Sequence, residues 1–134
     1  HTFDENKTDI NFLMSELVRM VERIAYELRQ DEKVAGCVAV KIRYPNFETT
    51  SRQTTIDYTC ADDEIIPVAK ELFNKLWKKG QPIRLLGVRL SELTNDAVQT
   101  NLFDDVERKY DLYKAIDNVK QRFGKASVKR ASSN

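Results

Sequence analysis

Apolar side chains recur every three or four residues in two long stretches of the chain, a spacing typical of helices packed on one side. The first predicted helix begins near Thr8 or Asp9, either of which can cap it, and ends near Asp31. The second begins at 62–64, three acids that favour the positive end of a helix dipole, and ends at Gly80. The predicted buried positions of the two helices are Leu13, Leu17, Met20, Val21, Ile24, Leu28, Ile65, Ala69, Leu72, Phe73, Leu76 and Trp77.

Three further stretches have the composition of strands. Residues 35–44 alternate between apolar and polar, and residues 49–58 are rich in threonine, which has a high β-propensity. The turn signal at 45–46 separates them, so we expect these two strands to pair antiparallel. A third strand is predicted from about 81 to 90. It contains Gly87, which suggests either a bulge or the close approach of another backbone.

The predicted order is helix, strand, strand, helix, strand. Adding a first strand that lies mostly before His1 gives an α+β fold, a ferredoxin-like βαββαβ antiparallel sheet with both helices on one face. The other face would be open and would carry Lys41 and Arg43 on one strand and Arg89 on another. A bulge in the last strand would decide where Arg84 points.

The C-terminal third is predicted to lie outside this domain, which we assign to residues 1–91. Residues 92–104 are expected to form a polar linker, and residues 105–124 an amphipathic helix. Residues 125–134 are expected to form a disordered basic tail. The apolar positions of the predicted helix are Tyr110, Tyr113 or Ala115, Ile116 and Val119.

The net charge of +1 does not identify a partner, but the charges are unevenly distributed. Acids gather at 62–64 and at 104–105, whereas the C-terminal end is basic. The basic residues there are Lys120, Arg122, Lys125, Lys129 and Arg130. A chain with almost no net charge can therefore still present a basic face.

No catalytic or metal-binding set is expected in this chain. The single histidine is His1, and Cys37 and Cys60 lack the spacing of metal ligands or of a disulfide framework, so we expect reduced thiols in a cytoplasmic protein. The acids at 62–64 are better explained as helix capping than as metal ligands.

No apolar run approaches membrane-spanning length and no signal peptide is visible, so no membrane partner is expected. Because the sequence starts at His1 rather than Met, we expect a piece of a longer protein.

Four segments resemble, in order and spacing, parts of one known domain. Residues 1–4 resemble the end of a linking strand, residues 47–56 a Thr/Ser/Arg-rich strand, and residues 83–88 a strand with the pattern V-R-L-L-G-V. Residues 113–124 resemble a helix that ends A-[IV]-D-x-[IV]-[KR]-x-[KR]-[FY]-G. This domain is the little finger of Y-family DNA polymerases of the bacterial DNA polymerase IV type, the impB/mucB/samB family. The resemblance covers nearly the whole chain.

The resemblance implies the DNA-binding domain of an error-prone translesion DNA polymerase. Such a domain holds double-stranded primer–template DNA by its phosphates, beside a catalytic core of the same chain that uses Mg²⁺. No cofactor is expected in this fragment itself, which lacks the catalytic residues. Phosphate contacts need cations and hydrogen-bond donors on a stiff surface. The residues expected to supply them are Lys41, Arg43, Ser51, Arg52, Thr54, Arg84 and Arg89.

Residues 99–103, with the sequence Gln-Thr-Asn-Leu-Phe, resemble the Q-L-[SD]-L-F peptide by which bacterial polymerases bind the sliding clamp. The resemblance implies that Gln99 forms a hydrogen bond at the mouth of a groove in the clamp, and that Leu102 and Phe103 are buried in it. Thr100 stands where the pattern usually has Leu, which removes one apolar anchor. The alternative is that Leu102 and Phe103 staple the last helix to its own domain.

Three other interpretations remain at this point. A non-catalytic Y-family relative would act as an adaptor in a mutagenesis complex, and the sequence before His1 would then lack metal-binding acids. A ferredoxin-like RNA-binding module would need exposed aromatic residues on the sheet, for which Tyr44, Phe47 and Tyr58 are the candidates. A structural interaction domain would bind no nucleic acid.

Overall fold

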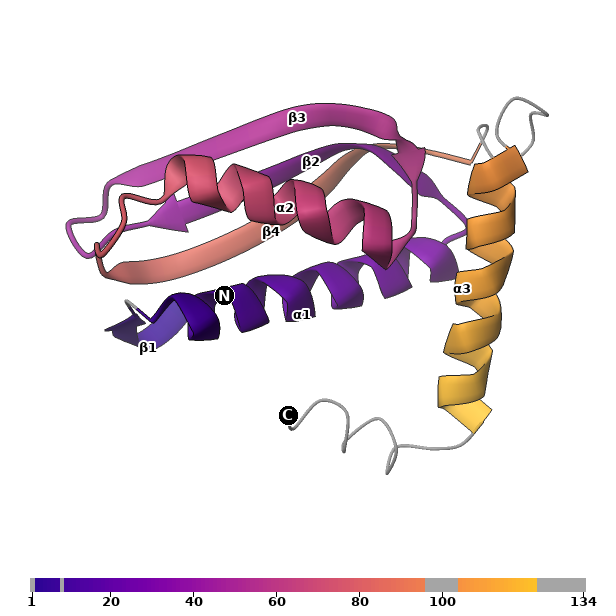
Figure 1. Cartoon of the computed structure of the whole chain (residues 1–134), viewed down its shortest axis with the longest axis horizontal. Coiled ribbons are helices and arrows are strands. Elements are labelled where there is room, and N and C mark those ends of the chain that lie inside the picture. Colours follow the sequence, from indigo (N-terminus) through magenta and orange to yellow (C-terminus); the bar gives the residue numbers. More distant parts are fainter. Residues whose placement is uncertain (1, 8, 96–103, 123–134) are drawn as a thin grey trace.

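The computed structural model of the chain describes residues 2–7, 9–95 and 104–122 (Figure 1). Their elements follow the predicted order, with a strand before the first helix and a helix after the last strand. In chain order the elements are β1 (Thr2–Lys7), α1 (Ile10–Gln30), β2 (Val34–Arg43), β3 (Thr49–Thr59), α2 (Asp62–Leu76), β4 (Ile83–Thr94) and α3 (Asp104–Arg122).

The strands form one antiparallel sheet in the order β1-β4-β2-β3. The last strand, β4, therefore lies between β1 and β2. Helices α1 and α2 pack side by side against the same face of this sheet (Figure 1). The predicted fold class, an α+β fold with an antiparallel sheet and two helices on one face, is confirmed.

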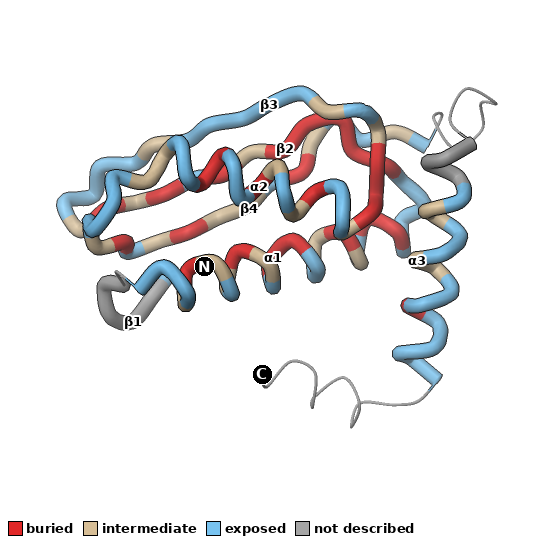
Figure 2. Tube along the Cα trace, in the orientation of Figure 1, coloured by how far each residue is buried: buried red, intermediate tan, exposed pale blue. Residues whose placement is uncertain are grey.

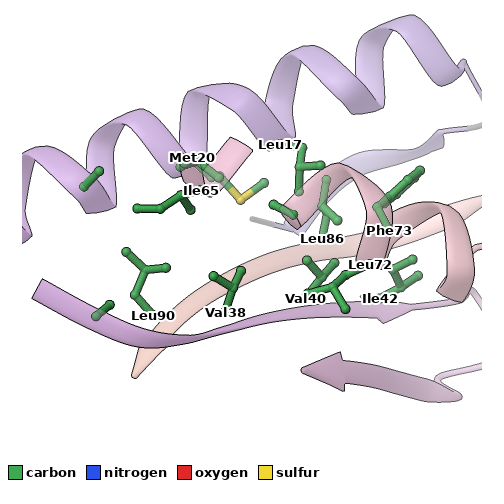
Figure 3. Close-up of a cluster of buried hydrophobic side chains, with 14 of the residues drawn as sticks. Leu17, Met20, Val38, Val40, Ile42, Ile65, Leu72, Phe73, Leu86 and Leu90 are labelled. Carbon is green, nitrogen blue, oxygen red and sulfur yellow. The ribbon is translucent and has the colours of Figure 1, made fainter. Parts of the chain in front are cut away.

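The core lies between the helices and the sheet, where apolar side chains from both layers meet (Figure 3). Val38, Val40 and Ile42 on alternate positions of β2 are completely buried, as are Leu17 of α1 and Phe73 of α2. Fully burying a side chain of this size contributes roughly 1.5–3 kcal/mol. The period of two in β2 and the helical period in α1 and α2 thus fix which face of each element turns inward.

Three element boundaries differ from the expected ones. A six-residue strand, Thr2–Lys7, lies where we expected only the end of a strand, and it pairs irregularly with β4. Helix α2 stops at Leu76 instead of Gly80, which occupies a following turn with a φ of 86°. Strand β4 continues to Thr94, so the first residues of the predicted linker belong to the sheet.

Helix α3 packs against the end of the domain with its polar and aromatic side rather than its aliphatic side. Asp117 is buried and Tyr113 half-buried at the contact, whereas Leu112, Ile116 and Val119 are exposed (Figure 2). Ile116 and Val119, two of the apolar positions of the predicted helix, are therefore not buried. The predicted tail at 125–134 lies outside the described residues. Within the described ranges, no helix is both long and apolar enough to cross a membrane.

Candidate nucleic-acid interface

The face of the sheet opposite the helices gathers cationic side chains from two neighbouring strands. Because Val40 and Ile42 point into the core, Lys41 and Arg43 point away from it. Lys41 lies directly opposite Ser51 of β3, and residues directly opposite each other in an antiparallel ladder share a face. In the same way Arg89 of β4 lies opposite Ala39. Lys41, Arg43, Ser51 and Arg89 are therefore together on what we call the open face.

The charges on the open face are not neutralised by neighbouring acids. Lys41 and Arg89 are exposed, and neither forms an ion pair with another residue in the described ranges. The guanidinium of Arg43 donates a hydrogen bond from Nε to the Thr49 hydroxyl at 3.0 Å, which holds this side chain across the two strands. These cations are thus presented on a stiff ladder and are available to an anionic ligand.

Arg52 and Thr54 lie on the other face of β3. They are opposite Val40 and Val38, whose side chains point toward the helices. Thr54 also lines a shallow cavity together with Val68 of α2. The predicted set is therefore divided between two faces, because alternate residues of a strand point in opposite directions.

Arg84 lies at the start of β4, just before the ladder with β2 begins at Leu85. Its guanidinium carbon is 5.3 Å from the centre of the Phe47 ring, a distance at which a cation and an aromatic face attract each other. Phe47 is 67% exposed and has a φ of 67° in the β2–β3 hairpin. Arg84 is thus exposed at the end of the sheet where Arg43 also lies.

The aromatic residues that an RNA-binding platform would need are not assembled on the open face. Tyr44 is buried, and its hydroxyl donates to the Leu76 carbonyl at 3.4 Å and accepts from the Lys78 amide at 3.2 Å. The half-buried Tyr58 packs against Gly36. Phe47 alone of the three candidates is exposed, and it belongs to the hairpin turn.

Gly87 lies within a regular part of β4. Pairing with β2 stays in step from Leu85 to Thr94, so the predicted possibility of a bulge at Gly87 is wrong. The irregular register lies instead between β4 and β1. Gly87 is opposite Lys41, and a Cβ atom added to it would meet nothing within 4 Å.

Residues 1–102 match the model of the impB/mucB/samB family C-terminal domain. The chain belongs to this family. It is 34% identical over 137 residues to DNA polymerase IV of Desulfatibacillum aliphaticivorans, an alignment that covers 98% of this chain and 35% of that protein. It is 33% identical over 119 residues to DNA polymerase IV of Pelotomaculum thermopropionicum, covering 87% and 30%. The chain spans about a third of the length of these relatives.

The fold is also similar to a part of a solved structure described as an insertion ternary complex of Dbh DNA polymerase. The two share a TM-score of 0.58 and 17% identity, over 67% of this chain and 26% of that one. Together with the family match, this confirms the resemblance to the little finger domain of Y-family DNA polymerases.

Helix α3 lies beyond the residues matched by the family model and is joined to the little finger domain through Arg29 of α1. Only 2% of the Arg29 side chain is exposed. It donates to both carboxylate oxygens of Asp117, at 2.8 and 3.2 Å, to the Cys60 carbonyl at 2.7 Å and to Asp62 at 3.0 Å. Its guanidinium carbon also lies 4.7 Å from the centre of the Tyr113 ring. We call this group the Arg29 cluster.

Sequence reasoning did not find the Arg29 cluster. Burial disfavours the charge on Arg29, but the hydrogen bonds that Arg29 donates to Asp117 and Asp62 outweigh this, so the pKa of Arg29 is raised. Burial raises the pKa of Asp62, against the effect of Arg29. The one available signal was Asp117 itself, an acid between Ile116 and Asn118 in the amphipathic stretch that forms the last predicted helix.

The acids at the start of α2 hold α3 as well as favouring the helix dipole. Asp63 accepts hydrogen bonds from Lys109 and from the Tyr113 hydroxyl, both at 3.0 Å, and Lys109 also reaches Glu64 at 3.4 Å. The hydrogen bond from Lys109 lowers the pKa of Asp63. Among the described residues, no group of His, Cys, Asp or Glu side chains is arranged to hold a metal ion. The predicted clamp-binding residues Gln99, Leu102 and Phe103 lie outside the described residues.

Proposed function

We propose that this little finger domain binds double-stranded primer–template DNA by its phosphates, through the open face, as part of a translesion DNA polymerase. The observation that carries this proposal is that Lys41 and Arg89, which form no ion pair with the described residues, lie next to Arg43 and Ser51 on a sheet face opposite the helices. Such a surface offers the charge and the hydrogen-bond donors that phosphate contacts need, and phosphate contacts carry no sequence information. It therefore suits a protein that must bind any sequence.

The test is duplex binding by this chain, measured by fluorescence anisotropy over a series of salt concentrations. We expect the variant Lys41→Ala/Arg89→Ala to bind roughly tenfold or more weakly at low salt, because charge-assisted hydrogen bonds are lost. The slope of log affinity against log salt should fall by about two, near one for each lost phosphate contact.

The matched control is Lys70→Ala/Lys75→Ala, which removes the same charge from exposed positions of α2 on the helical side. This control should change affinity by less than about threefold, because distant exposed charges are largely screened. Equal losses in the two double variants would mean that net charge, rather than the open face, drives binding.

We further propose that residues 99–103 bind the bacterial sliding clamp and recruit the polymerase to it. Burying Leu102 and Phe103 contributes roughly 1.5–3 kcal/mol each, which fits an affinity near the micromolar level. A peptide spanning residues 99–104 should bind the clamp of the source organism in a calorimetric titration. The same peptide with Leu102→Ala/Phe103→Ala should not bind. Equal binding of both peptides would show that residues 99–103 are not a clamp-binding motif.

The nucleotidyl transfer itself, with its Mg²⁺, is assigned to the part of the protein that corresponds to the other two thirds of the relatives. An adaptor without catalysis is the alternative. The presence or absence of paired metal-binding carboxylates in that part of the sequence distinguishes the two.

A further inference from the structure

We propose that Gly87 marks the place where the sugar–phosphate backbone of a duplex comes closest to the sheet. This inference rests on the proposed binding of DNA by the open face and identifies the contact point within it. Glycine in the interior of a strand costs about 0.5–1 kcal/mol relative to alanine, so its presence needs a reason. In strands, that reason is often a bulge or the close approach of a ligand or another backbone.

The fold itself does not require a glycine at this position. Gly80 has a φ of 86°, which favours glycine, and a Cβ atom on Gly36 would lie 2.9 Å from the Tyr58 ring. Gly87 has neither a left-handed φ nor a neighbour within 4 Å of an added Cβ, and its pairing with β2 is regular. Among the glycines in the described ranges, it is therefore the one that internal geometry leaves unexplained.

Gly87 lies among small and cationic residues of the open face. It lies in a row with Lys41 and Ser51 across three neighbouring strands, and the next row contains Arg89 opposite Ala39. Two adjacent positions on the open face, Gly87 and Ala39, thus have little or no side chain. Lys41 and Arg89, whose long side chains can bend toward a bound group, border them.

The missing side chain acts by distance rather than by direct bonding. The Gly87 backbone belongs to a strand that pairs with β2 in regular register. Without a Cβ, a phosphate can rest on the ladder itself, within short range of both cations. Because Coulomb attraction grows as distance falls, this closer approach strengthens both charge contacts at once.

The experiment compares Gly87→Ala and Gly87→Val with the wild-type chain by thermal unfolding and by duplex anisotropy. Because nothing lies within 4 Å of an added Cβ, both variants should keep the wild-type melting temperature within a few degrees, and valine should lower it no more than alanine, since valine favours strands. Duplex affinity should fall by about threefold with alanine and about tenfold or more with valine, because the larger side chain keeps the phosphate farther from the sheet. The control Ala115→Val, at an exposed position of α3, should bind DNA as the wild type does.

The possible results separate this inference from the proposed function. If Gly87→Val folds and binds normally while Lys41→Ala/Arg89→Ala does not, the close approach is refuted and the DNA-binding face stands. If the wild-type chain does not bind duplex even at about 20 mM salt, where phosphate contacts are strongest, both fail together. If Gly87→Ala does not fold, the glycine is structural and the inference is wrong. Inorganic phosphate at constant ionic strength should not displace the duplex, and specific displacement would identify a free-anion site instead.

Discussion

Arg29 in the last turn of α1 and Asp117 in α3 are 88 residues apart in sequence and form a buried ion pair, with Arg29 Nε 2.8 Å from Asp117 Oδ2. Both side chains are only 2% exposed. A buried charge that loses its partner is strongly destabilising, whereas replacing a whole buried pair by apolar residues is often nearly neutral. The attachment of α3 to the domain is therefore sensitive to the loss of either member of this pair.

Removing one member of the pair should destabilise the protein strongly. We expect Asp117→Ala to lower the free energy of unfolding by about 3 kcal/mol, because Arg29 keeps only Asp62 as a carboxylate partner. The triple variant Arg29→Met/Asp62→Asn/Asp117→Leu, which removes every charge of the Arg29 cluster, should recover most of this loss. Urea denaturation measures both values.

The exposed pair between Lys75 and Glu71 provides the control, since its nitrogen–oxygen distance of 3.0 Å is similar but its side chains are more than half exposed. Lys75→Ala should cost less than about 1 kcal/mol. If Asp117→Ala cost no more than Lys75→Ala, the buried pair would not be what holds α3.

Stability in acid should depend on Asp63. Its pKa is lowered in the folded protein by the hydrogen bond from Lys109, so its contribution to stability is present above its unfolded pKa of about 3.9 and is lost as pH falls through the lower folded value. We therefore expect the wild type to lose more stability than Asp63→Asn between about pH 5 and pH 2. Chemical denaturation at a series of pH values measures the difference.

Asp62 makes stability change with pH in the opposite direction to Asp63 over the same pH range. Burial raises its folded pKa, so its contribution is greatest below the unfolded pKa and falls as pH rises through the folded one. The comparison must therefore be made between wild type and Asp63→Asn at each pH, since Asp62 is common to both. Parallel pH profiles of the two proteins would contradict the assigned role of Asp63.

Cys60 should report on the docking of α3. Burial raises the pKa of its thiol to about 11, and only 1% of the residue is exposed. In a Cys37→Ser background at pH 8, the thiolate fraction should be roughly a hundredfold smaller than that of an ordinary cysteine, so alkylation by iodoacetamide should be slow. Because Arg29 binds both the Cys60 carbonyl and Asp117, Asp117→Ala should accelerate this labelling. Rapid labelling of the parent, or no change on Asp117→Ala, would show that Cys60 does not sense α3.

The elements that bury an apolar face could be predicted from the sequence, because the spacing of their apolar residues indicates which side faces the core. Helix α1, predicted from Thr8 or Asp9 to about Asp31, occupies Ile10–Gln30, and its Asp9 cap accepts a hydrogen bond from the Asn11 amide at 3.0 Å. The same reasoning placed Lys41, Arg43 and Arg89 on the open face. It did not separate Arg52 and Thr54 from them, because the register of a threonine-rich edge strand has no apolar pattern to fix it.

The packing of α3 could not be predicted from its own pattern. Ile116 and Val119 are apolar positions of that pattern, but the helix turns Asp117 inward to meet Arg29. That contact joins two residues that no local rule connects. The role of Gly87 could not be predicted from the sequence either, because a glycine in a strand indicates either a bulge or the close approach of another group. The regular pairing of β4 with β2 in the structure excludes the bulge.

The position of β4 in the middle of the sheet has a consequence for folding during translation. The segment Ile83–Thr94 supplies the neighbour of both β1 and β2, yet it is the last strand of the domain to leave the ribosome. At ~5–20 residues per second, roughly 4–15 s pass between the synthesis of Lys7 and that of Ile83. β1 has no partner throughout this interval, and from the synthesis of Thr59 onward the nascent β2–β3 hairpin has an uncovered edge, which makes this the period when chaperones matter most to this chain.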